Sequence, residues 1–278
     1  MSKLKVSELF YSLQGEGRFM GTPSVFLRTF GCNFTCSGFG MPKGQLSNER
    51  DLVAANVGLY KQYGYLPLVS TGCDSYASWD VRFKHLSPVL TTESIAEAIV
   101  DTLPFKEWRD EHLIITGGEP LLGWQKAYPD LLDDPKMDNL KELTFETNGT
   151  QRLSDDLKKY LFSKKQLNVT FSVSPKLSVS GEKWEEAIQP KIVREYEWFG
   201  SAYLKFVIAS EEDCDEALKA TDEYRKEGFK GPVYLMPVGG VESVYAMNNK
   251  AVALLAMKHG LRYSDRLQVP LFKNQWGT

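Results

Sequence analysis

From Ser24 onward, short apolar runs alternate with longer helix-like segments, and this alternation limits the possible folds more than any other feature of the sequence. It is typical of βαβ units, in which helices connect neighbouring parallel strands. The predicted strands cover residues 25–29, 113–116, 142–146, 169–173, 204–209, 233–236 and 267–271. The predicted helices cover residues 92–103, 124–132, 154–161, 211–226 and 244–259. About six parallel strands predict an α/β fold that forms an incomplete TIM-type barrel, with its chemistry at the carboxyl ends of the strands.

Length and composition are those of one soluble α/β domain that spans residues 1–278. A chain of 278 residues with 42% hydrophobic and 25% charged residues can bury a large core. The net charge of -3 argues against the basic surface that tight nucleic-acid binding requires. Residues 1–6 lack an apolar leader and no run of eighteen apolar residues occurs. We therefore expect a cytoplasmic protein that binds neither membranes nor, directly, nucleic acid.

Residues 37–72 interrupt the alternation of strands and helices. The segment is rich in glycine and polar residues, with one possible short helix near residues 48–60. Long loops inside compact domains are more often functional or disordered than neutral. We interpret residues 37–72 as an insertion within the domain that folds around the neighbouring cysteines. A surface loop without function is the alternative.

Three of the four cysteines lie in two short, glycine-flanked pieces. Three residues separate Cys32 from Cys36, and Cys73 follows Gly72. Three thiolates on one iron or zinc centre leave a coordination position open for a substrate or cofactor. This pattern favours a catalytic metal centre over a disulfide framework. Cys214 stands among acidic residues, which disfavour a thiolate, and is interpreted as structural.

Polar or glycine-rich motifs stand next to the predicted strands. In a parallel sheet the carboxyl ends of the strands share one edge, so the motifs that follow strands are expected to face one mouth. One motif precedes the first strand, and the others follow later strands: residues 13–17, 116–120, 146–149, 174–176 and 236–240. Taken singly they are weak signals: a Gly-Glu-Gly turn at 15–17 is usually only a turn, and Arg28 could form a salt bridge instead of binding a substrate carboxylate.

The combination of motifs is similar to that of a known family. Cys-x3-Cys, a later Cys-Asp-Ser at 73–75 and Thr-Gly-Gly-Glu-Pro at 116–120 resemble the radical S-adenosylmethionine enzymes. The stretches 10–17 (FYSLQGEG) and 25–28 (VFLR) narrow the resemblance to the 7-carboxy-7-deazaguanine synthases. Further similar stretches are residues 146–149, 174–176, 205–207, 262–267 and 277–278, so the resemblance covers nearly the whole chain.

The resemblance implies a [4Fe-4S] cluster that binds S-adenosylmethionine and, when reduced, cleaves it to a 5′-deoxyadenosyl radical. In the family this radical takes a hydrogen from C6 of 6-carboxy-5,6,7,8-tetrahydropterin. Ring contraction and loss of ammonia then give 7-carboxy-7-deazaguanine, an intermediate of queuosine and other 7-deazapurines. The protein orients the reactants and excludes side reactions. The resemblance also implies Mg²⁺, an electron donor such as flavodoxin, and a homodimer.

Site residues follow from the positions that match the family's motifs. The residues expected to act in catalysis are Cys32, Cys36 and Cys73, which hold the cluster, together with Glu16 and Arg28. The expected pterin contacts are Leu13, Gln14, Gly15, Glu16, Arg28, Thr116 and the terminal carboxylate of Thr278. The expected contacts with S-adenosylmethionine are Gly72, Asp74, Gly118, Glu119, Glu146, Ser174, Pro175, Lys176, Met236, Pro237, Val238 and Gly239. Ser75 is the expected Mg²⁺ ligand.

The sequence departs from the family in two places. Thirty-six residues separate Cys36 from Cys73, and Gln268 stands where the family leads us to expect histidine. Two other functions are compatible with the cysteines. One is a different radical S-adenosylmethionine reaction, such as activation of a glycyl-radical enzyme. The other is a non-catalytic zinc site in which His85 is the fourth ligand.

Overall fold

The structure is a computed structural model that describes residues 2–278, and its framework is one mostly parallel sheet. The strands are β1 (Lys3–Leu13), β2 (Pro23–Thr29), β3 (Val89–Thr91), β4 (His112–Gly117), β5 (Glu142–Thr147), β6 (Asn168–Val173), β7 (Ser201–Ile208), β8 (Val233–Pro237) and β9 (Arg262–Tyr263). Their order in the sheet is β3-β1-β2-β4-β5-β6-β7-β8-β9. Strand β1 pairs antiparallel with β2 and β3, and every pair from β2 to β9 is parallel. The predicted α/β class is confirmed.

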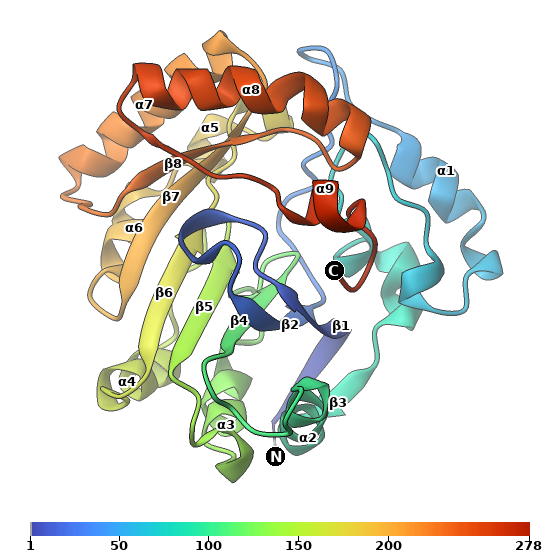
Figure 1. Cartoon of the computed structure of the whole chain (residues 1–278), viewed down its shortest axis with the longest axis vertical. Helices are drawn as coiled ribbons and strands as arrows, with labels where there is room; N and C mark the ends of the chain where they lie inside the picture. The colour runs from blue at the N-terminus through green and yellow to red at the C-terminus, as the bar shows by residue number, and fades with distance from the viewer. Residues whose placement is uncertain (1) are drawn as a thin grey trace.

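Helices connect the parallel strands and run along the outside of the sheet, as Figure 1 shows for α2, α3, α4 and α6. The α-helices are α1 (Glu49–Ala55), α2 (Thr92–Thr102), α3 (Tyr128–Leu132), α4 (Asp155–Ser163), α5 (Trp184–Ala187), α6 (Pro190–Tyr196), α7 (Glu211–Lys226), α8 (Glu242–Lys258) and α9 (Gln268–Phe272). The 3₁₀ helices are η1 (Gly17–Phe19), η2 (Val57–Leu59), η3 (Tyr63–Tyr65), η4 (Tyr76–Ser78), η5 (Val81–Leu86), η6 (Gln125–Ala127), η7 (Pro135–Met137) and η8 (Ser178–Ser180). None of the helices between residues 2 and 278 combines the length and apolar character that a membrane span requires.

The main core lies between the sheet and these outer helices. Phe145 on β5 and Phe171 on β6 are register partners, and their rings stack with centroids 5.6 Å apart. Tyr196 of α6 stacks on Phe171 at 4.6 Å. Because side chains alternate along a strand, the next residues, Glu146 and Ser172, point to the opposite face of the sheet. The apolar outer face therefore leaves the inner face free for polar side chains.

One prediction about the elements is wrong, and one long strand was not predicted. Residues 267–271 form helix α9 instead of a strand, since Pro270 cannot donate to a sheet ladder and Leu271 remains 53% exposed. Strand β1 was not predicted. Most residues of β1 are half-buried, because β1 is an antiparallel strand near one margin of the sheet. Its sequence therefore lacks the continuous apolar run that marks the central strands.

Residues 37–72 contribute to a second, small hydrophobic core. The helix predicted near residues 48–60 is α1 followed by the short η2. Ala54, Tyr63, Leu66 and Val69 pack there against residues of the following η4 and η5. The Glu49 carboxylate closes the segment by accepting hydrogen bonds from the backbone and side chain of Ser70. Residues 37–72 thus pack against the residues that follow Cys73.

Candidate functional site

A cavity of about 250 Å³ is lined by the inner face and the carboxyl ends of the parallel strands. Arg28 of β2 is the register partner of Thr116 of β4, and Glu146 of β5 is the partner of Ser172 of β6. Partners in register share a face, so these side chains converge on the cavity. Strands β7 and β8 continue the same wall with Lys205, Val207 and Met236.

The three predicted cysteine ligands come together in this cavity. Cys32 and Cys36 follow β2, and Cys73 comes after residues 37–72; all three line the cavity and share one small apolar cluster. All are free thiols. Burial raises the pKa of Cys32 to about 12, and burial raises the pKa of Cys36 and of Cys73 as well. The site therefore holds neutral thiols, which a metal centre would deprotonate on binding.

Hydrogen bonds fix the two cysteine pieces. The Glu182 carboxylate accepts from the backbone N–H groups of Thr35 (2.8 Å) and Cys36 (2.7 Å). These bonds support Cys36 in a left-handed conformation (φ 48°), which is unfavourable for a residue with a side chain. The Trp79 indole N–H donates to the Cys73 sulfur at 3.4 Å. Donors at sulfur are typical of thiolates that hold metal clusters.

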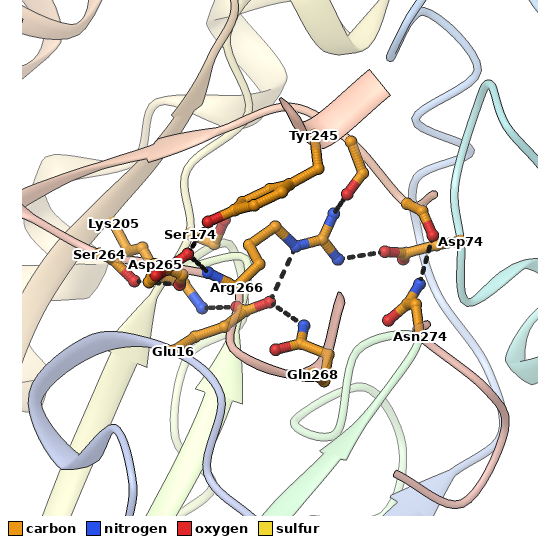
Figure 2. A network of polar contacts seen from close by, with 12 residues as sticks. Glu16, Asp74, Ser174, Lys205, Tyr245, Ser264, Asp265, Arg266, Gln268 and Asn274 are labelled. Carbon is orange, nitrogen blue, oxygen red and sulfur yellow. Dashed lines mark hydrogen bonds and ion pairs between the residues drawn. The ribbon is translucent and has the colours of Figure 1, made fainter. Parts of the chain in front are cut away.

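A buried network of charges centres on Glu16, as Figure 2 shows. The Glu16 carboxylate accepts from Lys205, from Arg266 (Nε, 3.2 Å) and from Gln268 (Nε2, 2.8 Å). Arg266 also pairs with Asp74 and donates to the Gly239 carbonyl. Burial acts to raise the pKa of Glu16, but the charges of Lys205 and Arg266 outweigh it and lower that pKa to about 2. Glu16 is therefore ionised and rigidly held.

Arg28, the expected partner of a substrate carboxylate, is held by the protein on one side. Its Nε donates to Glu8 at 2.8 Å, and its Nη1 donates to the Ser75 hydroxyl at 3.2 Å. The salt bridge considered as an alternative for Arg28 is therefore present, and Arg28 still lines the cavity. Ser75, the expected Mg²⁺ ligand, lies beside it and also contacts Asp74 at 3.3 Å.

Most predicted site residues line the cavity, and three do not. Glu119, Pro175 and Pro237 lie outside the lining. Glu119 is fully buried, where it accepts from the Leu121 N–H, the Thr147 hydroxyl and, at 2.6 Å, the Asn148 N–H. Burial raises its pKa to about 7. The Glu119 carboxylate links the turns after β4 and β5 through these bonds, and its expected contact with S-adenosylmethionine stays a prediction.

The sequence did not assign roles to several residues that complete the site. Glu8, Lys205, Arg266 and Trp276 line the cavity, although no site role was predicted for them. Lys205 carried a usable signal, because it is a single cation between the buried apolar residues of a central strand. Lysine is almost never fully buried unless it is paired.

The structure does not support the zinc alternative. His85 lies on η5 with its side chain exposed and is not among the cavity residues. Across residues 2–278, no three His, Cys, Asp or Glu side chains lie close enough together to hold a single metal ion. A tetrahedral zinc site requires that proximity.

Gly118 sits where β4 meets the first cysteine piece, and we expect Gly118→Ala to disturb this contact. An added Cβ would lie 2.4 Å from the Gly31 carbonyl oxygen and 2.7 Å from the Cys32 Cβ. Overpacking against backbone should lower the free energy of unfolding by about 1–3 kcal/mol, measured by denaturant titration. Gly58→Ala is the control, since nothing lies within 4 Å of its Cβ position. Equal stability of the two variants would contradict the prediction.

Comparison with known proteins agrees with this geometry. No model of a known protein family matches the chain. A 7-carboxy-7-deazaguanine synthase of Halobacterium salinarum is 30% identical over 98% of this chain and 91% of its own length. The enzymes of that name from Pyrobaculum aerophilum and Rhodopirellula baltica are 25% and 27% identical over at least 99% of this chain and 90% of their lengths. The crystal structure of QueE from Escherichia coli shares the fold, with a TM-score of 0.55, 18% identity and coverage of 95% of this chain and 94% of that one. Near-complete coverage at this identity shows that the chain belongs to the family of 7-carboxy-7-deazaguanine synthases.

Proposed function

We propose that this chain is a radical S-adenosylmethionine lyase of 7-deazapurine biosynthesis. It would convert 6-carboxy-5,6,7,8-tetrahydropterin to 7-carboxy-7-deazaguanine with loss of ammonia, on the route to queuosine. The observation that carries this proposal is the convergence of three thiols and the Glu16 network on one cavity in a member of the synthase family. The curved inner face would be the interior of an incomplete barrel within a single domain, with residues 37–72 inserted into it.

A [4Fe-4S] cluster held by Cys32, Cys36 and Cys73 fits the thiols of this site. The three cysteines line one cavity and share one small cluster with Phe34 and Ala187. The bound cluster would supply the electron that cleaves S-adenosylmethionine. The chain's own residues would support such a cluster in two ways. The Glu182 carboxylate holds the turn at Cys36, and the Trp79 indole N–H donates to the Cys73 sulfur.

The S-adenosylmethionine side of the cavity would be formed by residues near the thiols. Lys176 lies there, with its Nζ 3.1 Å from the Ser174 hydroxyl, and offers a cation for a carboxylate. Gly118 lets a ligand approach the backbone closely. Other lining residues proposed for this side are Gly72, Asp74, Glu146, Met236, Val238 and Gly239. Glu119, Pro175 and Pro237 are also proposed for this side, and Glu119 is held there by the Asn148 N–H.

The pterin side would be formed by the Glu16 network and the face of β2. Leu13, Gln14, Gly15, Glu16, Arg28, Thr116 and Thr278 all line the cavity. Gln14 is oriented by its bond to Glu146 (Nε2 to Oε1, 3.1 Å), and Arg28 presents a cation to the substrate carboxylate. Mg²⁺ would bind at the Ser75 hydroxyl with substrate oxygens and water. Glu16, ionised above about pH 2, would accept from ring N–H groups.

The decisive test begins with protein purified and reconstituted without oxygen. We expect about four iron and four acid-labile sulfide per chain, with absorption bleached by dithionite, followed by consumption of 6-carboxytetrahydropterin with a reductant such as flavodoxin. Full cluster occupancy without turnover would contradict the specific reaction and favour a different radical reaction. Zinc without sulfide would overturn the radical chemistry altogether. Mass measurement in solution tests the proposed homodimer.

Trp79→Phe is expected to make the reconstituted cluster harder to reduce. The indole N–H at 3.4 Å from the Cys73 sulfur offsets negative charge on the thiolate, and phenylalanine keeps the ring but not the donor. Hydrogen bonds to cluster sulfurs help set the potential, so the midpoint should fall by roughly tens of millivolts in a redox titration followed by electron paramagnetic resonance. Trp198→Phe, at a 65% exposed side chain, is the control. Identical potentials in all three proteins would refute a role for this hydrogen bond.

A further inference from the structure

The insertion touches the cavity through a segment that lies more than two hundred residues away in sequence, residues 274–278. The Trp276 indole N–H donates to the Leu66 carbonyl at 2.8 Å. The Trp276 ring meets Tyr63 edge to face, with centroids 4.8 Å apart, and Tyr76 at 5.8 Å. Figure 1 shows the C-terminal segment beside α9 and turned toward the side of α1. Trp276 therefore packs against the small core that contains Tyr63 and Tyr76.

The same segment forms part of the cavity wall. Residues 274–278 all line the cavity. On one side the Asn274 amide donates to the Gly240 carbonyl at 2.8 Å, next to the strand end of β8. On the other side Gly277 lines the cavity together with Glu8, the partner of Arg28. Trp276 thus joins this part of the cavity wall to Tyr63 and Leu66.

Tyr63 is the residue of the insertion that couples these contacts. It is 7% exposed, and its hydroxyl has no hydrogen-bond partner among residues 2–278. Burial raises the pKa of this hydroxyl well above the usual range; the charge of Glu8 acts in the same direction and that of Arg28 in the opposite one. The neighbouring Tyr65 of the same 3₁₀ helix is 66% exposed. The buried face of η3, which carries Tyr63, therefore packs against Trp276, whose segment lines the same cavity as Arg28.

We propose that the inserted segment 37–72 sets substrate binding by clamping residues 274–278, with Tyr63 and Trp276 as positioning residues. The ring of Tyr63 and the carbonyl of Leu66 hold Trp276, and Trp276 holds the wall that faces Arg28. Neither side chain transfers a proton or electron in this role. The identity of the substrate rests on the proposed function, whereas the clamp itself does not.

The clamp is tested first without turnover, by hydrogen exchange of the peptide that contains residues 274–278. Tyr63→Ala removes the ring that packs on Trp276, so exchange there should accelerate roughly tenfold or more. Tyr63→Phe should exchange like the parent protein, because the lost hydroxyl has no partner within the part of the chain that the structure describes. Tyr65→Ala, from the exposed side of η3, is the matched control. Trp276→Ala removes the other half of the contact and is the second variant if Tyr63→Ala does not fold.

The kinetic test uses the reconstituted enzyme and the pterin. In Tyr63→Ala and Trp276→Ala we expect KM for the pterin to rise roughly tenfold, with unchanged iron content and nearly unchanged kcat. Tyr63→Phe should restore the parent KM. Unchanged exchange in both alanine variants would overturn the clamp. Loss of iron without a change in KM would also overturn it, because residues 37–72 would then act by holding the cluster. If the parent protein does not turn over the pterin, the proposed function fails while the exchange result still decides the clamp.

Discussion

Cys73→Ala is expected to abolish the iron–sulfur centre, whereas Cys214→Ala should leave it intact. Cys73 lines the cavity with the other two thiols, and a cluster that loses one of three protein ligands is no longer retained. Iron and sulfide should fall from about four of each per chain to near zero after reconstitution, and turnover should fall to background. Metal analysis, the visible spectrum and the pterin assay measure these losses.

Cys214 provides the matched control because it carries the same thiol in a different setting. It is completely buried in α7 and packs within the main core. Its truncation leaves a small cavity that should cost about 1 kcal/mol of unfolding free energy without changing iron content. Equal loss of the cluster in both variants would refute the assignment of Cys32, Cys36 and Cys73 as the ligand set.

Much of the sheet could be predicted because its central strands are buried on both faces. Residues 113–116 are a continuous apolar or β-branched run, and residues 169–173 are such a run except for Ser172; these runs are typical of parallel strands. The region 267–271 carries a similar apolar run but surrounds a proline and packs only Val269 inside. Composition alone does not distinguish an apolar run that forms a strand from one that forms a helix. The outcome depends on the elements against which each run packs.

Part of the candidate site could likewise be predicted from the sequence, and part could not. Residues such as Arg28 and Thr116 could be placed from the sequence, because neighbouring parallel strands bring their inner faces and carboxyl ends together. The Glu16 network could not, since its partners Lys205 and Arg266 lie 189 and 250 residues away. The clamp on Trp276 likewise joins residues 210 apart. Contacts of this kind depend on the closure of the whole sheet, which no local pattern records.

Lys205→Met should strongly destabilise the fold, because the buried Glu16 carboxylate loses one of the cations that pair with it. It keeps the neutral Gln268 amide and Arg266, and Arg266 also pairs with Asp74. Breaking one partner of a buried ion pair costs about 3–5 kcal/mol of unfolding free energy. The measurement is denaturant unfolding at pH 7. Lys226→Met is the matched control: its ion pair with Glu223 is exposed on the surface, so the loss there should stay below about 1 kcal/mol.

The same network predicts an acid dependence with a definite sign. The pKa of Glu16 is about 2 in the folded protein against an ordinary 4.5, so its ionised form stabilises the fold above about pH 4.5. That contribution, about 3 kcal/mol, is lost as the pH falls from 4.5 toward 2. In Lys205→Met the pKa of Glu16 is less depressed, and the unfolding free energy should fall less steeply over this range. Identical slopes in the two proteins would contradict the assignment.

A double replacement separates the pair interaction from the cost of an isolated charge. Glu16→Gln with Lys205→Met removes both charges together, so no unpaired carboxylate or ammonium remains between them. The double variant should therefore lose less unfolding free energy than the two single variants lose in sum. The difference, the coupling energy, should be about 1–3 kcal/mol. Additive losses would mean that Glu16 and Lys205 do not depend on one another. Coupling would instead establish that the rigidity of Glu16, and hence its fixed orientation toward the cavity, is a property of the pair.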